Sequence, residues 1–164
     1  MKRFVGPLSL LVVLAVAVGF AGTAAGSSTN FTAKYAGKVH EVVNGSNVTG
    51  TPSGKGTATL IGKGSMTGTV MGNQSSSTGC TPLTGTGTLK GPKGTLKLKL
   101  TNSPSPSTAC GAQDDHNSIT FYGTAKVTGG TGAVKKARGN LHYSGHYDRG
   151  TGAFSVKLTG TLKH

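Results

Sequence analysis

The chain has no tryptophan, four tyrosines, five phenylalanines and only four acidic residues among its 164 residues. With so few aromatic side chains it cannot bury a thick hydrophobic core, and it has little with which to stack nucleic-acid bases. A specific nucleic-acid-binding protein is therefore not predicted. The sequence is rich in serine but contains no G-x-S-x-G motif, and its GKGT and GKGS segments lack the full spacing of a phosphate-binding loop. A serine hydrolase and an ATP-binding enzyme are both disfavoured.

The abundant residues are glycine, of which there are 28, and threonine. Much glycine and low hydrophobicity are typical of disordered chains, because such chains gain too little by burial to offset the entropy lost on ordering. Here, however, glycine and proline together stay below the share of low-complexity chains, and the apolar residues alternate regularly with polar ones. We therefore expect a folded chain of one domain.

Residues 1–25 have the pattern of a secretory signal peptide. Lys2 and Arg3 precede an uncharged apolar stretch at residues 8–20, and residues 21–28 are small. An uncleaved anchor is the alternative, because about 20 apolar residues can span a bilayer. We predict cleavage near Ala25, so that residues 26–164 form a single secreted, extracytoplasmic domain without a membrane span.

Alternation of period two is clearest in the last third of the chain, and it predicts strands that bury one face. The three segments are 119–127, 140–148 and 153–163, and glycine-rich turns link them. Leu96, Leu98 and Leu100 likewise alternate with Lys97 and Lys99.

The whole chain reads as eight strands without a convincing helix. The earlier five are 31–43, 56–64, 65–72, 84–91 and 94–102. Residues 46–54 are polar enough to form a loop, although Asn44-Gly45 is also a tight-turn signal. Residues 102–117 form the longest predicted loop, and Lys135-Lys136 belongs to a turn or a single helical turn. Eight short antiparallel strands favour a closed all-β barrel, which has no free edges; a β-sandwich is the alternative.

Two segments carry a family resemblance. VTGGTGAVKKARGNL (127–141) and YDRGTGAFSVKLTGTL (147–162) resemble the turn, the re-entry and the closing hairpin of the allene oxide cyclase and dirigent barrel family, in particular its small exported bacterial members. The resemblance implies an eight-stranded antiparallel barrel. It does not imply the chemistry of the enzymes, because no acidic, proton-shuttling or substrate-gripping residue of theirs matches a position here.

Cys80 and Cys110 are the only cysteines. An exported protein meets conditions in which disulfides persist, and the two residues are too far apart for a CxxC motif. We predict a disulfide that closes a segment with two strands inside it. In the chain-entropy model a loop of this length contributes roughly 3 to 4 kcal/mol.

No catalytic residue, metal site or cofactor is predicted. His142, His146 and Asp148 share one strand face, but residues four apart lie about 13 Å from each other, so the two histidines cannot readily chelate one ion. A second cluster, Asp114, Asp115 and His116, is more typical of a solvated turn than of a weak cation site.

Glu41 is the single glutamate, and by register it lies on the apolar side of the first strand. A carboxylate inside a barrel would have the raised pKa that acid or base catalysis needs. We favour the alternative, in which a glycine bulge turns Glu41 outward.

Three functions remain open. The first is a non-enzymatic barrel that binds a small apolar ligand or an envelope component, with Phe121, Tyr143, Tyr147 and Phe154 on the inner wall and Glu41 as a further candidate. The second is an isomerase-like or stereochemistry-directing protein, which the resemblance allows; an inward Glu41 beside a tyrosine or histidine would favour it. A filled interior would exclude both of these functions.

The third is a surface protein that binds polyanions, such as an anionic envelope polymer or lipid headgroups. The net charge is +13, and removal of Lys2 and Arg3 leaves +11, which would attract polyanions. One contiguous lysine face would favour this function. Charge that only maintains solubility is the alternative. Oligomeric state is left open.

Overall fold

The computed structural model describes residues 27–74, 79–112 and 117–163. The predicted signal peptide therefore lies outside the described residues. The strands are β1 (Ser28–Asn44), β2 (Asn47–Ala58), β3 (Gly62–Asn73), β4 (Cys80–Gly91), β5 (Gly94–Thr101), β6 (Thr108–Gly111), β7 (Ser118–Gly130), β8 (Asn140–Asp148) and β9 (Ala153–Lys163), and a short 3-10 helix, η1, covers Gly132–Val134. Among these residues, none forms a helix with the length and hydropathy of a membrane span.

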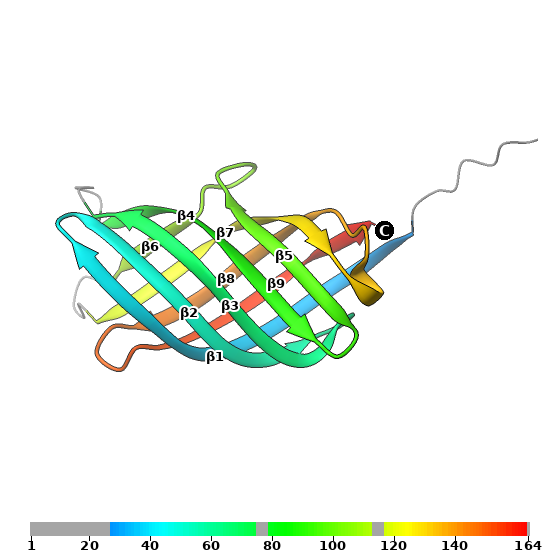
Figure 1. Cartoon of the computed structure of the whole chain (residues 1–164). Helices are drawn as coiled ribbons and strands as arrows, with labels where there is room; N and C mark the ends of the chain where they lie inside the picture. The colour runs from blue at the N-terminus through cyan, green and yellow to red at the C-terminus, as the bar shows by residue number, and fades with distance from the viewer. Residues whose placement is uncertain (1–26, 75–78, 113–116, 164) are drawn as a thin grey trace, which may run out of the picture.

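The strands form one closed antiparallel barrel (Figure 1). Each strand pairs with its neighbours around the ring, β1 pairs with β9, and the β3–β4 pairing completes the closure. β5 and β6 both lie between β4 and β7, one after the other, so the nine strands occupy eight positions. The predicted eight-stranded antiparallel barrel is confirmed, and the chain does not form a β-sandwich.

Side chains alternate between the interior and solvent, as the sequence predicts. Leu96 and Leu98 are buried, Leu100 is half-buried, and Lys97 and Lys99 are exposed. The same alternation holds along β8 and β9 and along most of β7, where Thr124 is the exception because it is buried. The barrel interior is therefore the core of this protein.

One end of the barrel is filled with its own side chains, and we call it the closed end. The large side chains with almost no exposure are Phe31, Ile61, Leu89, Leu96, Val134, Leu141 and Leu162, and they come from strand ends and turns at this end. The segment between β7 and β8, which contains η1, folds over it and buries Val134 and Ala137 (Figure 1). The first and last strands also begin and end there, since Ser28 pairs with Lys163.

The boundaries predicted for the second and third strands are wrong. β2 begins at Asn47, directly after a two-residue loop in which Gly45 has a φ of 59°, and the chain turns at residues 59–61 instead. The polar residues 46–54 suit a strand because the outer face of the barrel is solvated and the inner face here carries Gly50 and Pro52. The sequence predicts that Ile61 belongs to a strand. It lies instead in the turn between β2 and β3, where its buried side chain fills part of the closed end.

The predicted loop over residues 102–117 is also wrong in part, because it contains β6. Four residues are too few to show alternation. The prediction of a turn or a single helical turn before β8 is confirmed by η1.

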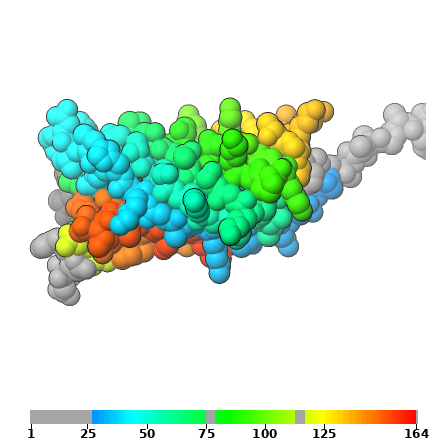
Figure 2. All heavy atoms as spheres, turned by 60° about the horizontal axis from the view of Figure 1, so that its bottom comes forward, coloured from blue at the N-terminus to red at the C-terminus, as the bar shows by residue number. Residues whose placement is uncertain are grey.

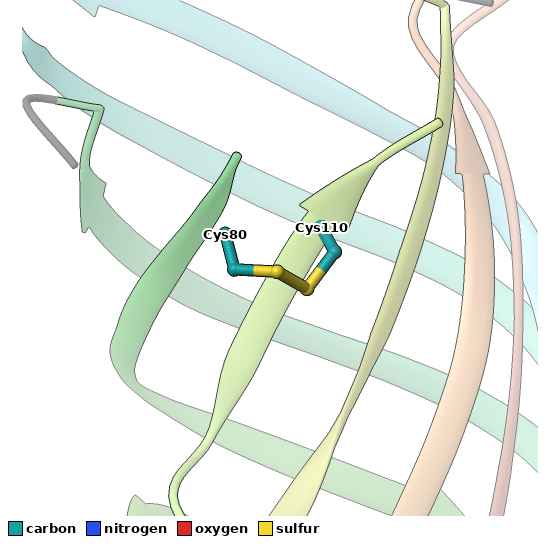
Figure 3. Close-up of a disulfide and its surroundings, with 2 residues drawn as sticks. All are labelled: Cys80 and Cys110. Atoms are coloured by element: carbon teal, nitrogen blue, oxygen red, sulfur yellow. A yellow bond between two sulfur atoms is a disulfide. The ribbon is translucent and has the colours of Figure 1, made fainter. Parts of the chain in front are cut away.

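The predicted disulfide is present and joins β4 to β6 (Figure 3). Cys80 and Cys110 are directly opposite each other, with their Cα atoms 4.1 Å apart. Their neighbours Thr81, Ala109 and Gly111 face the interior, so the bridge lies on the outer face. It fixes the short β6 to the wall at the end opposite to the closed one.

Candidate functional site

The barrel interior is hollow from its middle to the end that carries the β1–β2 and β8–β9 turns, which we call the open end. A cavity of about 500 Å³ occupies this half. Figure 2 shows the two hairpins, cyan and orange, at the same end of the molecule. The β8–β9 turn is shaped by the Asp148 carboxylate, which accepts a hydrogen bond from the backbone N–H of Thr151 at 2.8 Å.

The cavity wall is predominantly apolar, and every strand except the short β6 contributes large apolar side chains to it. All five residues predicted to bind a ligand line it: Glu41, Phe121, Tyr143, Tyr147 and Phe154. The rings of Phe121 and Tyr143 lie 6.3 Å apart between centroids. The structure thus brings the predicted residues together, and ligand binding by them stays a prediction.

Sequence reasoning missed the part of the wall formed by β2 and β3. Val48, Pro52, Met66 and Val70 line the cavity. The signal was present, because Val48, Gly50 and Pro52 alternate with threonine and serine. The polar composition of the segment nevertheless favours a loop.

Glu41 points inward, so the favoured outward orientation is wrong. β1 keeps an unbroken register with β2 from Ala33 to Asn44, so no bulge rotates the strand. The Glu41 side chain is only 20% exposed, and its Oε1 lies 3.5 Å from the Nε of Arg149. Arg149 lies two residues beyond Tyr147, at the cavity rim, and sequence reasoning did not single it out.

Tyr147 completes this group, which we call the rim cluster: Glu41, Tyr147 and Arg149. Burial raises the pKa of Tyr147, and the charge of the adjacent Glu41 and a hydrogen bond with it raise it further, while Arg149 acts in the opposite direction. A carboxylate, a phenol and a guanidinium therefore meet where the apolar cavity reaches the open end. They are groups that orient a polar part of a ligand.

The cavity wall is interrupted where β5 ends and β6 begins. Ser107 fills this gap. Its hydroxyl donates a hydrogen bond to the backbone carbonyl of Thr101 at 2.8 Å, and the backbone carbonyl of Thr124 is a second, more distant acceptor at 3.3 Å. A Cβ on Gly123 would lie 2.6 Å from the Cα of Ser107, so only glycine fits there. The segment that connects β5 to β6 is thereby held against β7.

Tyr143 lies across the same gap, directly opposite Gly123 on β8. Its hydroxyl is close to Ser107 but makes no hydrogen bond of ordinary geometry with the described residues. Burial raises the pKa of Tyr143, and the Ser107 hydroxyl partly offsets this. The hydroxyl oxygen is enclosed by protein, so Tyr143 contributes its aromatic ring, and not its hydroxyl, to the cavity wall.

The two histidines of β8 do not contribute to the cavity. His142 and His146 are exposed on the outer face of β8. Within the described parts of the chain, no three histidine, cysteine, aspartate or glutamate side chains gather closely enough to hold a metal ion. Asp114, Asp115 and His116 lie outside those parts.

Searches of protein-family models and of curated proteins find no match to this chain. Among solved structures, the pterocarpan synthase dirigent protein GePTS1 is similar in fold, with a TM-score of 0.47 and 12% identity over 94% of this chain and 97% of that one. The strand pairing of this chain itself shows the barrel that the sequence resemblance implies. At this level of similarity only the cavity and its own side chains bear on function.

The basic side chains are distributed around the circumference of the barrel, but they are unevenly distributed along its axis. Ten of them lie on the outer face of β1 to β5, β7 and β9 and the other five lie in turns, so no single side of the barrel gathers them. Along the axis, in contrast, most lie toward the closed end. In the described chain the acidic side chains are Glu41 and Asp148, both near the open end.

Proposed function

We propose that this protein binds a small, largely apolar ligand inside the barrel, through the open end. The observation that carries the proposal is the cavity of about 500 Å³, which is within the size range of small-molecule sites. A barrel of eight positions can be filled by its own side chains, and here only the closed half is filled. Glycines on the inner wall, such as Gly50, Gly72 and Gly87, leave the other half empty.

The proposed ligand enters with its apolar part first. Its body contacts Phe121, Phe154 and the ring of Tyr143, while a polar group stays with the rim cluster. We place this activity outside the cytoplasm, because the Cys80–Cys110 bridge belongs to an oxidising compartment and residues 1–25 have the pattern of a signal peptide.

The test is binding of lauric acid, measured by titration calorimetry, to the wild-type chain and to Gly87→Leu. Gly87 lines the cavity, and no atom lies closer than 3.8 Å to the position of an added Cβ. A leucine there occupies ligand space without disturbing the wall. We expect affinity to fall by about tenfold or more, which corresponds to about 1.4 kcal/mol of lost contact.

Thr84→Leu is the matched control, because it adds the same side chain to the exposed outer face of the same strand. It should bind like the wild type. A wild type that does not bind lauric acid, or a Gly87→Leu variant that binds it equally well, would contradict the proposal.

A stereochemistry-directing or isomerase-like role is the second candidate. It is favoured by the inward Glu41, which lies beside Tyr147 and Arg149 in a cavity able to hold a reactant. The test supplies a phenol and a separate one-electron oxidant, and measures the handedness of the coupled product by chiral chromatography. An excess of one enantiomer that disappears in Glu41→Gln supports this role, and a racemic product with the wild type excludes control of phenol coupling.

A further inference from the structure

The closed end carries a concentration of positive charge that the proposed ligand site does not use. Seven exposed basic side chains surround it, and we call them the basic cap: Lys63, Lys90, Lys93, Lys135, Lys136, Arg138 and Lys163. They come from the β2–β3 turn region, the β4–β5 turn, the β7–β8 segment and the end of β9. No acidic side chain of the described residues lies among them.

Backbone contacts tie these segments into one surface. The N–H of Lys93 donates to the carbonyl of Ile61 at 3.3 Å, and the N–H of Ala133 donates to the carbonyl of Lys93 at 2.7 Å. Arg138 and Lys163 exchange two backbone hydrogen bonds, of 2.8 and 2.9 Å. The basic cap is therefore held in place by the fold and is not a collection of unrelated side chains.

The protein maintains this arrangement at a cost. Like charges crowded at one end repel one another, and no carboxylate of the described chain compensates them there. Lys136 also has a φ of 63°, a left-handed conformation that costs a residue with a side chain roughly 1 to 2 kcal/mol. Residues held in such a conformation cluster at functional sites.

We propose that the basic cap docks this protein on an anionic lipid bilayer. The basic groups lie around one end of the barrel, and a ring of charge of this kind fits a flat anionic surface. A rod-like polymer would be fitted better by a stripe of charge along one side of the barrel. β1 also begins at this end, so whatever precedes Ser28 starts from it. A retained apolar segment would hold the closed end at the membrane, and cleavage would leave a positive amino terminus there.

The open end then faces away from the bilayer. Docking does not involve the cavity, so this inference stands or falls independently of the proposed ligand. The binding should be sensitive to salt, because interactions between exposed charges are screened over about 10 Å at 0.1 M ionic strength.

The test is co-sedimentation with vesicles of phosphatidylcholine alone or mixed with phosphatidylglycerol. Every strand lies within residues 28–163, so a chain that begins at Gly26 contains the whole barrel and excludes the apolar segment. We expect binding only to the mixed vesicles, and its loss as the salt concentration rises from about 0.05 M to about 0.5 M.

The decisive variant is Lys135→Gln/Lys136→Gln/Arg138→Gln. A basic side chain near an anionic bilayer contributes about a fivefold factor to binding, so the triple change should lower the partition coefficient about a hundredfold. Lys38→Gln/Lys99→Gln/Lys157→Gln is the matched control, because it removes equal charge from the outer wall away from the cap. It should lower the coefficient by less than about fivefold.

Three results would overturn the proposal. The first is equal binding to both kinds of vesicle or to neither, and the second is an equal loss in the two triple variants. The third is binding to soluble polyphosphate, weakened by the cap variant, without binding to mixed vesicles. That result would assign the basic cap to a soluble polyanion and not to a membrane.

Discussion

Removal of the disulfide is the perturbation with the most definite expected magnitude. The bridge closes a loop with a sequence separation of 30 residues, for which the chain-entropy model gives about 3 to 4 kcal/mol. β6 has only four residues, with three pairs to β4 and four to β7. Its own pairing is therefore too slight to replace the bridge.

We expect Cys80→Ser/Cys110→Ser to lower the free energy of unfolding by about 3 kcal/mol and Tm by roughly 10 °C. Urea denaturation followed by circular dichroism measures the first quantity, with reduced wild-type protein as a second sample that should behave alike. Thr81, Ala109 and Gly111 line the cavity beside the cysteines, so affinity for lauric acid should also fall.

A loss of less than about 1 kcal/mol, with the β6 amides still protected from hydrogen exchange, would refute this reasoning. It would mean that β6 is held by its strand pairing alone. Wild-type stability that does not respond to reductant, although the cysteines become reactive, would lead to the same conclusion.

Three substitutions test the packing and electrostatics of the barrel. Gly145→Ala should destabilise by about 1 to 3 kcal/mol, because an added Cβ would lie 2.3 Å from a β9 carbonyl oxygen, whereas Gly87→Ala should be nearly neutral; thermal denaturation compares the two. Lys34→Glu should stabilise by about 0.2 to 1 kcal/mol in low salt, because Lys34 is directly opposite Lys157; no gain, or an equal gain in high salt, would show that this pair does not interact. Tyr35→Phe should stabilise by about 1 kcal/mol, because it removes a buried hydroxyl that has no partner in the described residues. Burial also raises the pKa of Tyr35, so the folded state keeps this proton to higher pH than the unfolded chain does; wild-type stability should fall above about pH 10 and fall less in the variant, and identical pH profiles would contradict this.

The fold could be predicted from sequence where alternation is clean. In β7, β8 and β9, apolar residues on one face contrast with threonine, lysine and histidine on the other, and the structure follows this pattern except at Thr124, which is buried. In β2 the outer residues are threonine and serine and the inner ones include Gly50 and Pro52, so local composition resembles a loop. Only the closure of the barrel, a property of the whole chain, makes that segment a strand.

The sequence predicts which side chains form the inner wall of the barrel, but it does not predict that they enclose a cavity. Phe121, Tyr143, Tyr147 and Phe154 face inward because of their register, which the sequence displays. Whether these side chains fill the interior depends on the total volume of the side chains that all strands contribute to it. No local sequence pattern indicates that total volume. Arg149 was missed for a related reason, since it belongs to a turn that only the finished barrel brings back to Glu41.

The pairing of Ser28 with Lys163 puts the first and last residues of the barrel side by side, at the end farthest from the cavity entrance (Figure 1). A short peptide joining them would make a circular chain, and new termini could then be opened at another turn. A reporter domain or a surface tether attached at either terminus would leave the entrance unobstructed. The molecule is thus suited by its connectivity to immobilised or fused formats in which access to the interior is monitored.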